Sequence, residues 1–209
     1  MNSNKSLFQL IFLIGISISL VKMQTAQSTR ARFNSSDFKF NLKNSMPFAT
    51  GAGGTNKRAS LIELPSLKGI GVSYTLTEVE PCGIVLPHVH PRATEMIYVV
   101  YGQFQTAFVE ENEGRTILNN LVEGETTFFP QGLIHFEQNL GCTKAAFLAA
   151  FNSEDPGLLT LPNRLFTIPI QALTSSFNNT EEVINSLKER FVRSPAAGVG
   201  ECRARCSLN

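Results

Sequence analysis

Tryptophan, histidine and charge are all in short supply in this chain. Its 209 residues include no tryptophan, three tyrosines and three histidines, and charged residues make up 17% of the total. The formal net charge is +1, and the sequence contains no basic block. Because nucleic-acid binding depends on a concentrated positive surface, the composition argues against that function. A carbohydrate platform would need exposed tryptophan or tyrosine, so the phenylalanines around His135 are assigned to a core, namely Phe128, Phe129, Phe136, Phe147 and Phe151.

Long hydrophobic runs are missing too, apart from one near the start of the chain. Residues 7–21 (LFQLIFLIGISISLV) are apolar and uncharged, follow Lys5, and precede the small and polar stretch KMQTAQSTR. A membrane-spanning helix needs about 20 apolar residues, and this run is shorter. A basic residue, an apolar run and small residues at Ala26 and Ser28 are typical of a cleaved secretory signal. The sequence therefore predicts a signal peptide over residues 1–28 and an exported chain without a membrane segment.

Cysteine is limited to four residues and is absent before Cys82. In an exported protein, four cysteines favour disulfides over free thiols. The sequons that begin at Asn34 and Asn178 fit N-glycosylation in the same compartment, provided that they lie on the surface. These features predict a secreted, extracellular or cell-wall-associated glycoprotein. Disulfides are expected at all four cysteines, Cys82, Cys142, Cys202 and Cys206.

Short strand-like runs dominate the centre of the chain, where there is little helical periodicity. They are separated by glycine and proline turns and are predicted at residues 70–80, 84–90, 95–101, 103–110, 116–122, 126–129, 133–138 and 144–151. Many short strands of this kind indicate a β-sandwich or a double-sheet jelly roll. We therefore predict a β core over residues 69–153.

The segments on either side of this core differ from it in composition. Residues 29–68 are polar and form a predicted N-terminal extension, whose glycine-rich stretch TGAGGTNKR lacks a phosphate-binding pattern and is typical of a plain turn. Residues 154–193 form a predicted helical segment. Its last helix begins after the N-cap Thr180, continues to about Arg193, and has an apolar face suited to core or subunit contacts. The tail, residues 194–209, has no periodicity and is either ordered by a disulfide or a loose end.

All three histidines fall within two short stretches that resemble each other in composition. The first, GIVLPHVHPRATEMIYVVYG, holds His88, His90 and Glu95, and the second, GETTFFPQGLIHFEQN, holds His135. His88 and His90 are two residues apart on a predicted strand, so their side chains leave the same face. A single such histidine is more often a core residue, but three imidazoles and a carboxylate together form a coordination shell for a divalent transition metal. No histidine is then left to activate a serine or cysteine nucleophile.

The two stretches resemble the two sequence motifs of the cupin superfamily. The residues that carry the resemblance are Gly83, His88, His90, Glu95 and Gly102 in the first motif, and Gly124, Pro130, Gly132, His135 and Asn139 in the second. The strings PHVHPRATE, FPQGLIHFEQN and NSEDPG are most similar to germin-like and spherulin-like members, over residues 37–206. The tail GVGECRARC resembles fungal and slime-mould spherulin-like proteins, and the N-terminal cysteine pair of plant germins is absent.

This resemblance implies an all-β fold, a double-stranded jelly-roll β-barrel with C-terminal α-helices. It implies that His88, His90, Glu95 and His135 are metal ligands inside the barrel and that the metal is manganese (Mn²⁺). Residue chemistry alone does not choose manganese, because iron, zinc or nickel would also fit this donor set. The resemblance further implies a homo-oligomer, a trimer or a hexamer, with contacts made by the C-terminal helices.

The family also bears on the reaction. Oxalate-oxidising germins hold their substrate with two asparagines, and the matching positions here are Val85 and Thr75. Valine cannot donate a hydrogen bond, so oxalate oxidase ranks below the alternatives. One alternative is a manganese oxidoreductase of the superoxide dismutase type, which binds superoxide or another small anionic ligand at the metal and has no catalytic residue apart from the metal ligands. The other is a non-enzymatic wall, storage or dormancy protein in which the metal serves stability.

The resemblance also suggests how the cysteines pair. In a jelly roll the strand with His88 pairs with the strand with His135, so paired residue numbers sum to about 223. Cys82 and Cys142 fit that register, which predicts a disulfide between them. Cys202 and Cys206 are then left to pair with each other or with another chain. A zinc site at these residues would need further cysteine or histidine ligands, and none remains.

Overall fold

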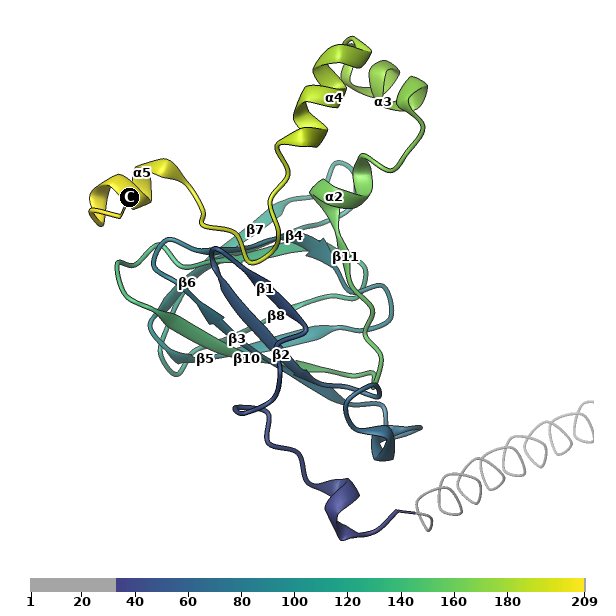
Figure 1. Cartoon of the computed structure of the whole chain (residues 1–209), viewed down its shortest axis with the longest axis vertical. Coiled ribbons are helices and arrows are strands. Elements are labelled where there is room, and N and C mark those ends of the chain that lie inside the picture. Colours follow the sequence, from purple (N-terminus) through teal and green to yellow (C-terminus); the bar gives the residue numbers. More distant parts are fainter. Residues whose placement is uncertain (1–32, 209) are drawn as a thin grey trace, which may run out of the picture.

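Two antiparallel β-sheets form the centre of the computed structural model, which describes residues 33–208 (Figure 1). The predicted signal peptide over residues 1–28 lies outside the described residues. One sheet has six strands in the order β1 (Ala49–Gly51), β2 (Gly54–Ala59), β3 (Ser73–Val79), β10 (Ala145–Phe151), β5 (Glu95–Tyr101) and β8 (Thr126–Phe129). The other has five, in the order β11 (Leu159–Thr160), β4 (Ile84–Val89), β9 (Ile134–Gln138), β6 (Gln103–Val109) and β7 (Thr116–Val122).

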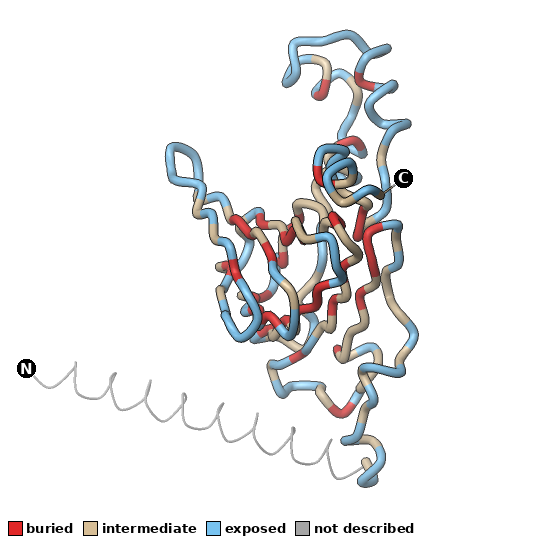
Figure 2. Tube along the Cα trace, turned by 90° about the vertical axis from the view of Figure 1, so that its left-hand side faces the viewer, coloured by how far each residue is buried: buried red, intermediate tan, exposed pale blue. Residues whose placement is uncertain are grey.

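The core lies between the two sheets because successive side chains of a strand point to opposite faces. In β5, for example, Glu95, Ile97 and Val99 are buried, whereas Met96 and Tyr98 are exposed. One continuous cluster fills the barrel, made of Val79, Val85, Ala93, Ile97, Val99, Phe104, Leu121, Phe129, Ala145, Phe147, Ala149 and Phe151. The buried residues in Figure 2 follow this barrel. The predicted all-β jelly-roll barrel is therefore confirmed.

A hairpin of β1 and β2 joins the sheet ahead of the strands that the sequence predicts. The turn predicted for TGAGGTNKR lies at its tip, where Gly54 adopts φ +140° and a side chain would collide with the Glu78 carbonyl. The hairpin strands are polar and give no alternating hydrophobic pattern. Pairing of β2 with β3 along their length holds them in the sheet instead, so local sequence does not reveal them.

Short helices make up the C-terminal part of the chain. They are α2 (Leu161–Leu165), α3 (Ile170–Phe177), α4 (Glu181–Glu189) and α5 (Gly200–Arg205), and two 3₁₀ helices, η1 (Ser35–Phe38) and η2 (Pro65–Leu67), lie near the N-terminal end. The predicted N-cap is confirmed, since the Thr180 side chain accepts a hydrogen bond from Val183 N, but α4 ends at Glu189 rather than near Arg193. Among the described residues no helix is long and apolar enough to cross a membrane.

Helices α3 and α4 form a hairpin that projects from the barrel (Figure 1). It has a small core of its own, in which Phe166, Leu173 and Ile184 are buried. The remaining apolar side chains of α3 and α4 include Phe177, Val183 and Leu187, which are exposed. The hairpin thus presents apolar surface that the rest of the described chain does not cover.

The C-terminal tail is ordered and returns to the barrel, where it forms both disulfides. Cys82 is bonded to Cys202 and Cys142 to Cys206, with Cα–Cα distances of 5.7 and 5.2 Å. All four cysteines are oxidised as predicted, but the predicted Cys82–Cys142 pair is wrong, and Cys202 and Cys206 pair neither with each other nor with another chain.

The physical reason is the position of the tail helix. Cys82 does lie beside Cys142, as the strand register requires, because Cys82 N donates to the Gly141 carbonyl at 3.1 Å. The tail then pairs Ala196 with Ile84 and places α5 over the same corner. Residues four apart face the same side of a helix, so Cys202 and Cys206 each reach one of the two barrel cysteines.

Candidate metal centre

A β-bulge in β4 aims the first histidines into the barrel. Val85 lies opposite Glu137 of β9, whereas His88 lies opposite His135, so β4 contains one more residue than β9 between these two pairs. Residues three apart in a regular strand point to opposite faces, and the extra residue corrects this. Val85 and His88 consequently both face the interior, and His90 follows at the end of the strand.

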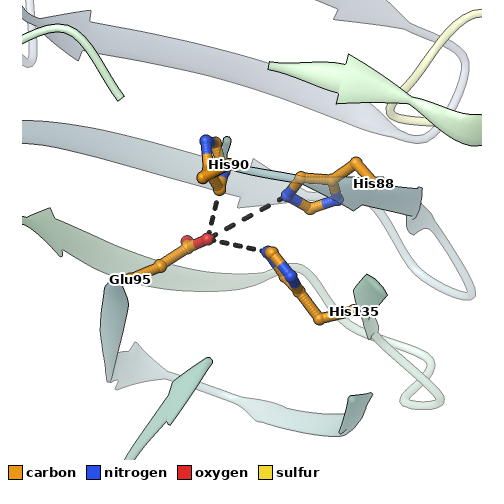
Figure 3. A group of neighbouring side chains, drawn as sticks. All are labelled: His88, His90, Glu95 and His135. Atoms are coloured by element: carbon orange, nitrogen blue, oxygen red, sulfur yellow. Dashed lines mark hydrogen bonds and ion pairs between the residues drawn. The ribbon is translucent and has the colours of Figure 1, made fainter. Parts of the chain in front are cut away.

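Glu95 approaches the three histidines from the opposite sheet, as Figure 3 shows. Its Oε2 atom lies 3.0 Å from His135 Nε2, 3.1 Å from His90 Nε2 and 4.0 Å from His88 Nε2. All four side chains are buried, and their nearest donor atoms lie within 4.8 Å of one another. The four residues predicted as metal ligands are thus brought together in one buried group.

Each histidine is held in one orientation by a backbone carbonyl. Nδ1 of His88 lies 2.9 Å from the Leu86 carbonyl, Nδ1 of His135 lies 2.8 Å from the Leu133 carbonyl, and Nδ1 of His90 lies 2.5 Å from the Gly157 carbonyl. A carbonyl only accepts, so each Nδ1 carries the proton and donates it. In each neutral ring Nε2 then has a free lone pair, and it points toward Glu95.

The carbonyl that orients His90 belongs to the loop with the sequence NSEDPG. Arg92 anchors this loop through Asp155, with a guanidinium–carboxylate distance of 2.8 Å. Thr94 N also donates to the Asn152 side chain at 2.9 Å. Gly157 has φ +70°, and a side chain there would collide with Pro91 and Arg92. This string, singled out by resemblance, therefore acts on the group indirectly, by positioning His90.

Burial keeps the His88 ring neutral. Burial, with added repulsion from His135, lowers the pKa of His88 from its ordinary 6.5 to about 3, although Glu95 opposes this. Because each Nδ1 proton is held by a backbone carbonyl, three Nε2 lone pairs and a carboxylate oxygen converge on one point.

This convergence fits a metal ion. Acceptors packed this closely repel one another until a cation lies between them. Donors about 2.1 Å from one ion and at right angles lie about 3 Å apart, which matches the spacings from Glu95 to His90 and His135. Three imidazoles and one carboxylate suit several divalent transition metals, so the group can hold a metal without its donor set identifying which one.

A cavity of about 580 Å³ leads to the group, which gives a small ligand room to approach. Thr75 and Val85, the two positions where oxalate-oxidising germins have asparagine, both line it. Glu137 lines it as well, and the sequence analysis did not identify this residue. The available signal was its spacing, because Glu137 lies two residues after His135 and shares its face of β9.

The two predicted glycosylation sites lie on the surface. Asn34 is exposed and caps η1, and Asn178 is exposed at the end of α3. Surface exposure is the structural requirement for modification, so both sites stay predictions.

Comparison with known proteins finds one matching family model and several related sequences. The family model described as Cupin (Cupin_1) matches residues 40–185. Spherulin-1B of Physarum polycephalum is 40% identical over 173 residues, which are 82% of this chain and 70% of that protein. The probable germin-like protein subfamily 2 member 5 of Arabidopsis thaliana is 38% identical over 157 residues, covering 74% of this chain and 73% of that protein.

Solved structures show the same architecture. A recombinant oxalate oxidase in complex with glycolate superposes with a TM-score of 0.70 at 30% identity, over 76% of this chain and 82% of that chain. The similarity to both spherulins and germin-like proteins agrees with the resemblance seen in the two histidine-containing stretches.

Proposed function

The chain belongs to the cupin family, and on that premise we propose that it is a secreted, manganese-binding oxidoreductase of the superoxide dismutase type. The observation that carries the proposal is the convergence of three histidine Nε2 atoms and Glu95 Oε2 at the inner end of an open cavity. A redox-active ion held by four protein donors keeps one or two positions free for a small ligand.

In this proposal the chain fixes the position of the metal ligands and packs aromatic side chains against them, and the ion supplies the change of oxidation state. The backbone carbonyls of Leu86, Leu133 and Gly157 fix the three rings, so the ligand geometry is set before any metal arrives. Phe129 stacks on His135 at 4.4 Å between ring centroids, and Phe151 packs against His90 at 4.7 Å, so each phenylalanine covers one face of a ligand ring. Dismutation converts two superoxide ions and two protons into oxygen and hydrogen peroxide.

Oxalate oxidation is supported less well. Val85 offers no hydrogen bond to a substrate, and Thr75 offers a hydroxyl in place of an amide. A buried site that lacks polar partners for a dianion binds it weakly. The similarity to oxalate oxidase in fold accordingly supports the metal site rather than that activity.

A wall, storage or dormancy protein is the second candidate. The observation that favours it is the 40% identity to spherulin-1B over most of the chain. In that case the ion would act as a structural ligand, which stabilises the folded chain because it binds the native state and not the unfolded one.

The two candidates differ in turnover. The experiment is superoxide dismutation by protein purified from a secretory host and loaded with manganese, beside His88→Ala and the exposed control Glu123→Gln. The enzyme proposal predicts activity proportional to bound manganese, retained in Glu123→Gln and lost in His88→Ala. Stoichiometric manganese without dismutation in any variant would overturn it and leave the structural candidate.

A further inference from the structure

The four cysteine sulfurs form one compact cluster where α5 returns to the barrel. They belong to two disulfides, Cys82–Cys202 and Cys142–Cys206. The Sγ atoms of Cys82 and Cys206, which are not bonded to each other, lie only 3.7 Å apart. A thiolate exchanges with a disulfide by attacking one of its sulfur atoms. Once its own bond is open, Cys206 is therefore placed to attack the neighbouring disulfide at Cys82.

The two disulfides differ in their access from solvent. Cys82 and Cys202 are 0% and 3% exposed, so their bond is shielded from a thiol in solution. Cys142 is exposed, and its partner Cys206 is half-buried. Because exchange requires access to a sulfur atom, an external thiol must react first at Cys142. The buried bond can then take part only through Cys206.

A guanidinium group lies beside both disulfides. Arg205 Nη1 is 4.0 Å from Cys142 Sγ, and Nη2 is 3.4 Å from Cys202 Sγ. Nη2 also donates to the Leu140 carbonyl, which holds the guanidinium in place. A neighbouring cation favours a thiolate over a thiol, and a stabilised thiolate leaves faster. Arg205 can therefore attract an incoming thiolate to Cys142 and stabilise Cys202 as the leaving group.

We propose that this cluster is a thiol–disulfide exchange site for a low-molecular-weight thiol, in which reaction at the exposed Cys142 passes to the buried bond. The external thiolate bonds to Cys142 Sγ, which breaks Cys142–Cys206 and releases Cys206 as a thiolate. Cys206 then bonds to Cys82 Sγ, which breaks Cys82–Cys202 and releases Cys202, and Cys202 takes a proton from water. Two disulfides are present before and after, so the exchange needs no further oxidant or reductant.

The exchange changes how the tail is attached without freeing it. At the start α5 is linked to the barrel through both Cys202 and Cys206. In the product a single link from Cys206 to Cys82 remains, and Cys142 carries the external thiol. This inference concerns only the tail and the edge of the barrel, so it stands or falls independently of the metal centre.

The sequence makes the exchange measurable, because trypsin places each cysteine on a separate peptide. Cys82, Cys142, Cys202 and Cys206 fall in residues 69–92, 116–144, 194–203 and 206–209. Folded wild-type protein is incubated with glutathione, and free thiols are blocked with N-ethylmaleimide before digestion. Mass spectrometry then identifies which peptides are joined, which carries glutathione and which is alkylated.

We expect a product with glutathione on residues 116–144, a bond between residues 69–92 and 206–209, and the alkyl group on residues 194–203. Glutathione on residues 116–144 with the alkyl group on 206–209 and the Cys82–Cys202 bond intact would overturn the transfer to the buried bond. Folded protein that does not react with glutathione would overturn the exchange site as a whole.

Arginine variants test the role of the guanidinium. Arg205→Gln should slow the loss of the Cys82–Cys202 bond by at least about threefold, whereas Arg205→Lys keeps the charge and should restore most of the rate. Arg190→Gln removes an exposed arginine at the end of α4 and should match wild type. Equal rates in Arg205→Gln and wild type would overturn the role of Arg205.

Discussion

At the scale of single residues, the metal group depends on one carboxylate that faces three imidazoles. Glu95 is the only anionic side chain within the group of four, and its Oε2 atom lies within 4.0 Å of all three Nε2 atoms. A carboxylate both binds a divalent ion and offsets its charge in a buried site. Removal of that charge with the shape retained should therefore act on metal affinity more than on folding.

Glu95→Gln is expected to lower manganese affinity by at least about a hundredfold, since even residues that only support metal ligands contribute 10–100-fold. The measurement is a competition titration against a chelator of known affinity. Glu123→Gln removes an exposed carboxylate and should match wild type. Equal affinities for the two variants would show that Glu95 is not a ligand.

Because the pKa of His88 is lowered on folding, the free energy of unfolding of the metal-free protein depends on pH. Its folded-state value is about 3 and its ordinary value is 6.5, so the unfolded chain takes up a proton over a range in which the folded chain does not. Stability is therefore lost as pH falls below 6.5, by up to about 1.4 kcal/mol per pH unit from this residue.

Urea unfolding of chelator-treated protein between about pH 7.5 and 5 measures this slope. His88→Gln removes the titrating group, so the variant should lose that part of the slope. If both proteins show the same dependence on pH, His88 does not carry the effect.

The sequence predicted the four members of the group but not everything around them. Spacing placed His88 and His90 on one face, and the two motifs added Glu95 and His135. The bulge that turns Val85 inward is a register feature of two distant strands, and no local pattern shows it. Glu137 was missed for a related reason. A charged residue two positions after a ligand histidine looks like a surface residue until that face of β9 is known to be buried.

At the scale of elements, the tail connects the disulfides to the metal group. The Ser194 hydroxyl accepts a hydrogen bond from Leu86 N at 3.1 Å, and the Leu86 carbonyl accepts the Nδ1 proton of His88. Ala196 pairs with Ile84 two residues earlier on the same strand. The tail therefore supports the segment of β4 that sets the orientation of His88.

Loss of either disulfide should destabilise the protein by about 2–5 kcal/mol, because the unfolded chain loses one of its two cross-links and gains conformational entropy. Cys142→Ala/Cys206→Ala leaves Cys82–Cys202 in place, and Cys82→Ala/Cys202→Ala does the reverse. The measurement is urea unfolding of each double variant. Wild-type stability in both would mean that the tail contributes nothing to the barrel.

Ser194→Ala tests the link to the metal without breaking a disulfide. It removes the acceptor for Leu86 N, so the Leu86 carbonyl is held less firmly and manganese affinity should fall by about tenfold, the scale of a supporting contact. The exposed Ser176 hydroxyl bonds only within its own helix, so Ser176→Ala is a control. Unchanged manganese affinity in Ser194→Ala would show that this contact of the tail does not influence metal binding.

The strands were predictable and the cysteine pairs were not, because strand signals are local whereas the disulfides join residues far apart in the sequence. Residues 95–101, 116–122 and 126–129 were predicted with the bounds that β5, β7 and β8 have, because alternation and turns are local signals. The disulfides join residues 120 and 64 positions apart in sequence. Their pairing depends on where a tail without periodicity returns, which only the folded barrel determines.

At the scale of the whole molecule, the chain exposes apolar surface in a projecting hairpin. Phe177, Val183 and Leu187 of α3 and α4 are more than two-fifths exposed. Surface of this kind on a small hairpin is typical of an interface, which fits the homo-oligomer that the family resemblance implies.

Leu187→Glu is expected to dissociate the oligomer, because it buries a charge in the proposed interface. Asn185→Glu introduces the same side chain on an exposed position of the same helix and is the matched control. Light scattering on purified protein measures the mass. Wild-type protein that runs as a monomer would contradict the oligomer, and an unchanged oligomer in Leu187→Glu would move the interface elsewhere.

The most direct test of the whole account is the metal content of protein purified from a secretory host and dialysed without chelator. The buried donors of His88, His90, Glu95 and His135 predict one metal ion per chain in wild type and in Glu123→Gln. They predict less than about a tenth of that in His135→Ala, with circular dichroism unchanged. Metal-free wild-type protein that does not take up manganese on loading, or a His135→Ala variant that keeps a full ion, would contradict the metal centre on which the proposed function depends.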